Sequence, residues 1–157
     1  MSKPSPPQVR IRPVGHAHRD LLLDMYGRFE PLGAALGLPP RLEDSRSQWV
    51  DSALDHDINA AAFTPRGELA GHCFLAPGDA GSAEVAVFVH QDSRRKGLGT
   101  NLLKTALEWA AAAGIRRVWG LASSDNRAAL RLLTNCGFHQ VRFASQEAEL
   151  EIYLPLP

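Results

Sequence analysis

The spacing of apolar and polar residues along the chain predicts short strands interspersed with amphipathic helices. Short segments with period-two alternation or a continuous apolar run are typical of strands, and apolar residues three and four positions apart are typical of helices. The pattern predicts seven strands, at residues 9–14, 59–64, 68–75, 83–89, 118–122, 138–143 and 149–154. It predicts four helices, at 20–29, 43–55, 98–113 and from the capping residues at 123–126 to 135.

The order of these elements predicts one α+β domain. Three strands between residues 59 and 89 follow one another across turn signals such as Pro65-Arg66-Gly67, which favours antiparallel pairing. Later strands alternate with helices, so we expect a mixed, mostly antiparallel sheet of about seven strands with about four helices on its two faces. A single domain is expected over 9–157, and a flexible lead over 1–8, which holds three prolines.

The bulk composition narrows the classes of function. The 157 residues include 17 Lys and Arg and 17 Asp and Glu, and this balance argues against electrostatic capture of nucleic acid or of anionic membranes. The two cysteines, Cys73 and Cys136, follow no disulfide-framework spacing and are interpreted as reduced packing residues of a cytoplasmic protein. No apolar run reaches the length of a membrane span, and no signal peptide is predicted.

Residues 87–100 run from a predicted buried strand through a basic turn into the start of a long predicted helix. The first N–H groups of a helix have no partner inside the helix, and with the helix dipole they attract anions. Gly97 and Gly99 have no Cβ, so an anionic group is able to approach the backbone there. Three cations precede the helix: Arg94, Arg95 and Lys96. This combination predicts a site for a pyrophosphate group.

Two common phosphate-binding signatures do not account for this segment, because it contains neither GxxxxGK(S/T) nor GxGxxG. The alternative interpretation is a basic turn that only caps a helix. A lone GxG would favour that alternative. A buried strand, an RxxGxG sequence and a long amphipathic helix together favour the anion site.

The same segment resembles the signature (Q or R)-x-x-G-x-(G or A) of the GNAT superfamily of N-acetyltransferases. The matching positions are Arg94, Gly97 and Gly99. A second stretch is similar to the family's final helix and its Gly-Phe ending, at Asn126, Ala129, Leu132, Gly137 and Phe138. The predicted elements from Val9 to Leu154 also follow the family's order. The resemblance implies the GNAT fold, with a V-shaped opening between the fourth and fifth strands, here 83–89 and 118–122.

The resemblance also implies how acetyl-CoA, or a related acyl-CoA, would bind as a co-substrate. Its pyrophosphate would lie against backbone N–H groups that follow Arg94, those of Arg95, Lys96, Gly97, Leu98, Gly99 and Thr100. The fourth strand would splay at a bulge and pair its backbone with the pantetheine arm around Phe88, Val89 and His90. The acyl carbonyl would lie in the V near a stabilising backbone N–H. Asn126 would contact the pantetheine arm, and its alternative interpretation is a simple helix N-cap.

Glu84 is the candidate general base, because it is a charged residue within an otherwise apolar predicted strand, AEVAVFV. A lysine-type amine arrives as an ammonium with a pKa of about 10.4 and must lose a proton before it attacks a thioester. A partly buried glutamate has a raised pKa and accepts a proton near neutrality. Some GNAT enzymes place a general-base glutamate at a similar point of this strand. The alternative is a strand-edge carboxylate that faces water or pairs with an arginine.

One position departs from the family's pattern. Leu133 stands where members often carry a tyrosine that protonates the leaving thiolate. Two functions therefore stay open: an N-acyltransferase that acts on a primary amine, of a small molecule or of a protein lysine, and a non-catalytic acyl-CoA-binding sensor. Glu84 and the glycine segment favour the enzyme, with direct attack in a ternary complex. No metal is predicted, His72 is interpreted as a core histidine, and the resemblance suggests a homodimer.

Overall fold

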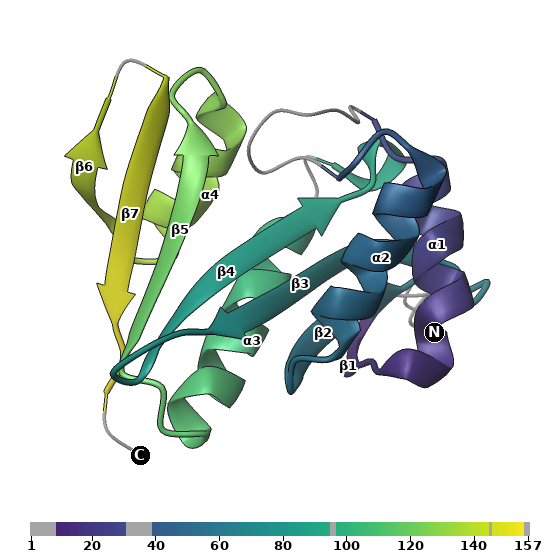
Figure 1. The fold of residues 1–157 in the computed structure, drawn as a ribbon, viewed down its shortest axis with the longest axis horizontal. Coiled ribbons are helices and arrows are strands. Elements are labelled where there is room, and N and C mark those ends of the chain that lie inside the picture. Colours follow the sequence, from purple (N-terminus) through teal and green to yellow (C-terminus); the bar gives the residue numbers. More distant parts are fainter. Residues whose placement is uncertain (1–8, 31–38, 95–96, 145, 156–157) are drawn as a thin grey trace, which may run out of the picture.

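In the part of the chain that the structure describes, seven strands form one sheet in the order β1-β2-β3-β4-β5-β7-β6 (Figure 1). The computed structural model describes residues 9–30, 39–94, 97–144 and 146–155, and the expected lead at 1–8 lies outside them. The strands are β1 Arg10–Pro13, β2 Ile58–Phe63, β3 Leu69–Pro77, β4 Ser82–Val89, β5 Arg117–Ser123, β6 His139–Phe143 and β7 Glu147–Tyr153. Neighbouring strands pair antiparallel except for β4 and β5. The predicted mixed, mostly antiparallel sheet is confirmed.

The four α-helices of the described residues cover the two faces of the sheet (Figure 1). α1 Arg19–Gly27 and α2 Glu43–Leu54 pack on one face, and α3 Leu98–Ala112 and α4 Arg127–Asn135 pack on the other. Two 3-10 helices that the periodicity did not predict, η1 His16–His18 and η2 Gln91–Ser93, precede α1 and follow β4. None of the described helices is long and apolar enough to span a membrane.

The parallel pair β4 and β5 is held together over a short distance only. Residues 82–84 lie opposite residues 117–119, and beyond Glu84 and Trp119 the strands diverge as a V (Figure 1). β5 pairs with β7 over its whole length, so it follows β7 away from β4. The bulge expected in the fourth strand is wrong, because β4 pairs with β3 in continuous register from Ala83 to Val89.

The sheet separates two hydrophobic cores. One lies under α3 and α4 and contains buried residues such as Leu102, Leu103 and Ala106. The other lies under α1 and α2 and contains Leu22, Met25, Tyr26, Val50 and four aromatic neighbours, Phe29, Trp49, Phe74 and Phe88. Because side chains alternate along a strand, β4 contributes residues to both cores.

A buried chain of hydrogen bonds ties the core under α1 and α2 to the sheet. Asn59 donates through Nδ2 to the C=O groups of Ala53 and His56, at 2.9 Å each. Asn59 Oδ1 therefore accepts from His72 Nε2 at 2.8 Å, and His72 Nδ1 accepts from the Tyr26 hydroxyl at 2.7 Å. Burial lowers the pKa of His72 to about 3. His72 is thus a neutral, fully bonded core histidine, as the sequence favoured.

We expect the buried hydrogen-bond chain through His72 to make the protein less stable in acid. Folded His72 stays uncharged down to a pH of about 3, whereas an ordinary histidine takes up a proton near pH 6.5. Between these values the unfolded state binds more protons, so the free energy of unfolding decreases as the pH falls, by up to about 1.4 kcal/mol per pH unit from this residue. Urea titrations between pH 7 and pH 4 measure this slope.

The variant His72→Gln keeps one donor and one acceptor in the chain and should show a shallower slope than the wild type. His56→Gln is the matched control and should keep the wild-type slope, because the His56 side chain makes no ion pair among the described residues. Identical slopes for the wild type and His72→Gln would contradict the assignment.

Candidate active site

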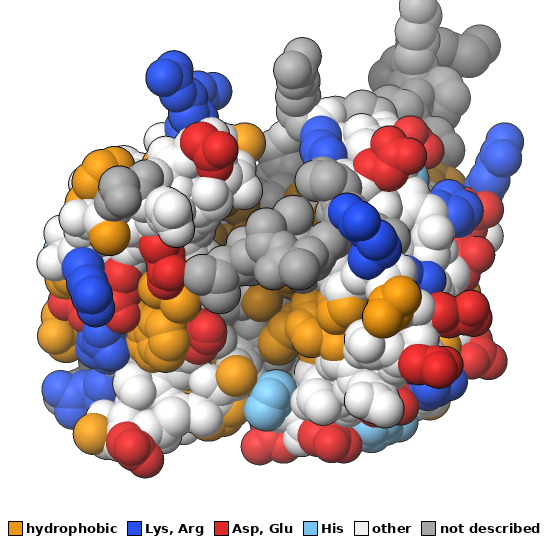
Figure 2. All heavy atoms as spheres, turned by 45° about the horizontal axis from the view of Figure 1, so that its top comes forward, with side chains coloured by type: hydrophobic (Ala, Val, Ile, Leu, Met, Phe, Trp, Pro, Cys, Tyr) orange, Lys and Arg blue, Asp and Glu red, His pale blue; other side chains and the backbone are white. Residues whose placement is uncertain are grey.

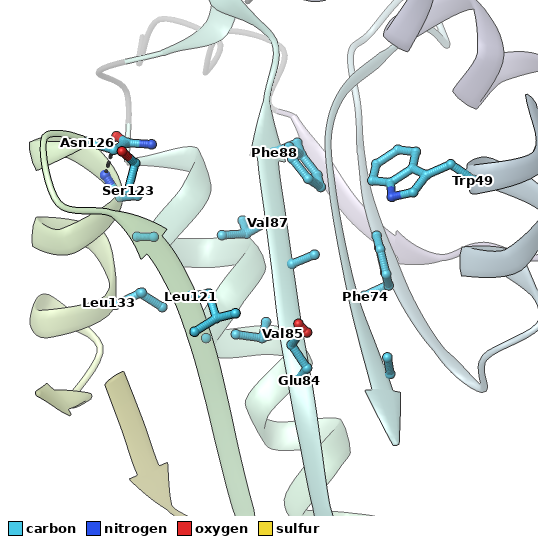
Figure 3. A pocket seen from close by; sticks show the side chains of 15 residues that line it. Trp49, Phe74, Glu84, Val85, Val87, Phe88, Leu121, Ser123, Asn126 and Leu133 are labelled. Atoms are coloured by element: carbon cyan, nitrogen blue, oxygen red, sulfur yellow. Dashed lines mark hydrogen bonds between the residues drawn. The ribbon is translucent and has the colours of Figure 1, made fainter. Parts of the chain in front are cut away.

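A cleft occupies the V between β4 and β5, with a cavity volume of about 300 Å³ (Figure 3). Viewed toward the open end of the V, the surface is hollowed and apolar side chains gather there (Figure 2). The lining residues come from α2, β3, β4, β5 and the start and body of α4: Trp49, Phe74, Ala76, Glu84, Val85, Ala86, Val87, Phe88, Gly120, Leu121, Ala122, Ser123, Asn126, Ala129 and Leu133.

The cleft connects the two faces of the sheet. Ala86 and Phe88 pack in the core under α1 and α2, whereas Val85 and Val87 pack in the core under α3 and α4. Because side chains alternate along β4, Glu84 shares the face of Ala86 and Phe88. A ligand on the α3–α4 side and a ligand on the α1–α2 side are therefore able to meet through the V beside Glu84.

The backbone edge of β4 that faces β5 is open beyond Glu84. His90 N–H donates to the C=O of Ala70 at 2.8 Å, so these two residues form a hydrogen-bonded pair of the β3–β4 ladder. Such pairs alternate along antiparallel strands, so Val87 and Val89 direct their N–H and C=O groups toward β5. Within the described ranges, the pairing of β4 with β5 ends at Glu84. Sequence reasoning missed Val87, because the choice of edge depends on the register with β3.

The three strand residues expected at the pantetheine arm differ in position. Val89 directs its N–H toward the V, while its C=O accepts a hydrogen bond from Arg94 Nε at 2.9 Å. Phe88 places its ring in the cleft wall. His90 is buried, and its N–H and C=O are both used in backbone hydrogen bonds within the chain. The open edge therefore consists of Val87 and Val89 rather than of all three predicted residues.

α3 begins at the glycine segment singled out in the sequence. Gly97 is the N-cap with a φ of +74°, a left-handed conformation that glycine adopts readily, and a Cβ there would meet open space. The first turn of α3 carries N–H groups that have no acceptor inside the helix, namely those of Leu98, Gly99 and Thr100. Arg95 and Lys96, which were expected beside them, lie outside the described residues.

Gly99 lies at a close approach between α3, α4 and the end of β4. A Cβ at this position would lie 3.3 Å from side-chain atoms of both Leu132 and Val89. Glycine therefore lets α3 pack closely against α4 and against the end of β4. The approach of an anion, which the sequence suggests for this glycine, stays a prediction beside this packing contact.

Arg94 holds the loop between β4 and α3. Its Nε donates to the C=O of Val89, its Nη2 donates to the C=O of Glu30, and its guanidinium carbon lies 5.2 Å from the centroid of the Phe29 ring. These contacts join the end of β4 to the segment that follows α1. The side chain thus fixes the turn from which α3 starts.

Asn126 and Leu133 flank the cleft from α4. Asn126 Oδ1 accepts from the N–H of Ala129 at 3.1 Å, so this residue caps the helix and lines the cleft at the same time. Leu133 is buried, and a Cβ on Gly120 would lie 3.7 Å from it. The α4 wall of the cleft is therefore apolar at Leu133, the position where the resemblance would imply a tyrosine.

Glu84 is the one charged side chain among the described residues that line the cleft. It is partly buried, and burial and the negative charge of Glu147 raise its pKa, in that order of importance. It makes no ion pair within the described residues. Its carboxylate is thus a base of raised strength, at the point where β4 and β5 separate (Figure 3).

Comparison with known proteins gives one family. A sequence model of the acetyltransferase (GNAT) family matches residues 20–138. A search of curated protein sequences finds no match. The matched range begins within α1, ends just after α4 and includes the β4–α3 segment.

Solved structures share the fold. The acetyltransferase of the GNAT family from Streptococcus pneumoniae superposes with a TM-score of 0.74 at 19% identity, over 94% of this chain and 100% of that one. The GNAT domain of PAT from S. lividans gives a TM-score of 0.77 at 23% identity, over 93% and 90%. A GNAT superfamily phosphinothricin acetyltransferase from Sinorhizobium meliloti, solved in complex with AcCoA, gives 0.74 at 16% identity, over 93% and 88%.

The predicted pyrophosphate site at α3 leads to a binding test. Replacing Gly97 with Glu places a carboxylate at the helix N-terminus, where the ligand's anion is expected, so acetyl-CoA affinity measured by calorimetry should fall by about tenfold or more. Gly114→Glu is the matched control, because Gly114 follows α3 with a φ of +87° and a Cβ there also meets open space. Both variants carry similar backbone strain, so equal acetyl-CoA affinities would contradict the assignment.

Proposed function

Because the chain belongs to the acetyltransferase (GNAT) family, whose model covers residues 20–138, we propose that it transfers an acetyl or other small acyl group from a CoA thioester to a primary amine. The observation that carries the proposal is the cleft in the V, which joins an open backbone edge on one side to the Glu84 carboxylate on the other. The amine attacks the thioester directly while both substrates are bound.

The acyl-CoA lies on the α3–α4 side. Its pyrophosphate binds at the first turn of α3, and its pantetheine arm runs along β4 as an added strand would, bonded to Val87 and to the N–H of Val89. The open edge of β4 and the apolar side chains below it support this placement. Asn126 stands at the start of α4 beside the arm, and its Nδ2 is a donor that the capping bond leaves unused.

The amine enters from the α1–α2 side and meets the thioester beside Glu84. Glu84 accepts one proton from the ammonium, and the amine nitrogen forms a bond to the acyl carbon. The carbon–sulfur bond then breaks, and the second proton that the nitrogen loses as the amide forms passes to the departing thiolate, so CoA leaves as the thiol. Backbone N–H groups at the open edge of β4 stabilise the oxyanion that develops. The raised pKa of Glu84 supports its role, because a base works best when its pKa lies close to the working pH.

The sensor function is a second candidate, and Leu133 is the observation that favours it. The buried leucine offers no proton to a leaving thiolate from α4. Acetyl-CoA binding by calorimetry, followed by free-thiol release with a panel of amines, separates the two candidates. Binding with amine-dependent release supports the enzyme, and binding without release from any amine supports the sensor.

Glu84→Gln should lower kcat by about a hundredfold or more, because the variant lacks the general base. In the wild type, kcat/KM should increase with pH as Glu84 loses its proton.

Glu147→Gln removes a negative charge that raises the pKa of Glu84, so the acidic limb of the pH–rate profile should move to lower pH. Free-thiol release measured between pH 5 and pH 9 gives these profiles.

Glu149→Gln is the matched control for Glu147→Gln, because Glu149 lies on the same strand and is not among the groups that shift the pKa of Glu84. The control should leave the acidic limb unchanged. Unchanged turnover and an unchanged profile in Glu84→Gln would remove Glu84 from the mechanism.

We also propose a homodimer that forms through β6. This strand ends the sheet, all its side chains are exposed, and Val141 and Phe143 are 44% and 62% exposed. An open edge strand with exposed apolar side chains is a template for pairing with another chain. Sedimentation velocity should show a dimer for the wild type and a monomer for Val141→Lys, and a monomeric wild type would contradict the proposal.

We propose a cytoplasmic location because the described cysteines are free thiols. In the described residues Cys73 is buried and free, and Cys136 is partly buried and free. Thiols persist in reducing compartments, whereas exported proteins of this size commonly use their cysteines in disulfides.

A further inference from the structure

The acceptor side of the cleft has an aromatic wall. It consists of Trp49 from α2, Phe74 from β3 and Phe88 from β4 (Figure 3). The Trp49 ring meets the other two edge to face, with centroids 5.8 Å from Phe74 and 5.3 Å from Phe88. Phe74 and Phe88 are almost fully buried, whereas Trp49 is only partly buried and borders the cavity. Trp49 is therefore the aromatic surface that a ligand reaches.

The wall is held rigidly from behind. The Tyr26 ring packs edge to face against Trp49 at 5.0 Å and against Phe88 at 5.7 Å. The Tyr26 hydroxyl is bonded to His72, which is bonded to Asn59. A preformed wall binds a matching ligand without the cost of ordering its own side chains.

Two alanines leave room between the wall and the carboxylate. Ala76 lies opposite Glu84 in the β3–β4 ladder, and Ala86 lies opposite Phe74 one step along. Alternate residues on one face of a strand are about 7 Å apart. A flat ring against Trp49 is therefore a short alkyl chain away from an amine beside Glu84.

The charge of the cleft disfavours other classes of amine. Glu84 is the one charged residue that lines it in the described ranges, so the carboxylate of an amino acid would lie beside another carboxylate with no cation to pair with. Glu147 and Glu149 line a smaller cavity of about 140 Å³ that shares only Leu121 with the cleft. The further ammonium groups of a polyamine would pair with these two carboxylates, which lie outside the cleft. A polyamine bound in this way would leave the aromatic wall unused.

We propose that the acceptor is a small primary amine joined by a short chain to a flat, uncharged aromatic group, and that Trp49 determines this specificity. The inference rests on the proposed function and adds the class of its acceptor. The ring lies against Trp49, and the amine lies at Glu84.

Four amines test the inference by acetyl-CoA-dependent thiol release. 2-Phenylethylamine has the proposed chemistry. L-Phenylalanine adds a carboxylate to the same carbon skeleton, and 2-cyclohexylethylamine has a puckered ring in place of the flat one. Spermidine has no ring and carries additional ammonium groups. We expect kcat/KM for 2-phenylethylamine to exceed that of each other amine by about tenfold or more. A higher or equal value for any of the other three overturns the inference.

Trp49→Leu should lower kcat/KM for 2-phenylethylamine by about tenfold, mainly through a higher KM, and should leave acetyl-CoA affinity unchanged. Trp109→Leu is the matched control on α3, on the opposite face of the sheet, and should keep the wild-type preference. An unchanged KM in Trp49→Leu overturns the role of Trp49.

The outcomes also separate this inference from the proposed function. Thiol release that prefers spermidine or L-phenylalanine, and that Glu84→Gln abolishes, keeps the proposed function and overturns the acceptor class. Acetyl-CoA binding with no release from any of the four amines overturns both.

Discussion

The site depends on one constraint, the limited pairing between β4 and β5. Three residues of each strand pair in parallel, and then β5 follows its antiparallel partner β7 while β4 follows β3. An interrupted ladder leaves backbone N–H and C=O groups without strand partners, which is costly when they are buried and useful when a ligand pairs with them. The V is therefore both an interruption in the sheet and the place where a substrate is able to complete it.

The walls of the V are stabilised independently on its two faces. On one face, Gly99 lets α3 pack closely against Val89 and Leu132, where an added Cβ would make tight contacts of 3.3 Å. On the other face, the Asn59–His72–Tyr26 chain fixes the aromatic residues under α1 and α2. Each buried polar side-chain atom in this hydrogen-bond chain has a partner, so burial does not leave an unpaired donor or acceptor there. The cleft can stay open because its walls are supported from behind.

Most elements of the fold could be predicted from local patterns, and most details of the site could not. The strand at 83–89 and the helix starting at Leu98 follow from periodicity and from Gly97, because these signals are local. The open edge at Val87 depends on the register with β3, and the packing role of Gly99 depends on α4. The location of Glu84 at the end of the parallel pairing depends on where β5 leaves β4. Such facts arise from residues far apart in the sequence, so a single sequence does not specify them.

The apolar side chain of Leu133 is compatible with catalysis. The reason lies in the pKa values of the attacking amine's ammonium form and of the thiol form of the leaving group. An alkyl ammonium has a pKa of about 10.4 and a thiol a pKa of about 8.5, so thiolate is the weaker base and leaves more readily than the amine. Removing the first proton from the amine is therefore the step that needs a positioned side chain, and the departing thiolate can take up the second proton that the nitrogen loses. On the proposed mechanism the single carboxylate of Glu84 supplies what the chemistry requires, and an apolar Leu133 contributes by excluding water from the thioester. Among the described residues that line the cleft, the one charged side chain lies on the side proposed for the amine, where the reaction needs it.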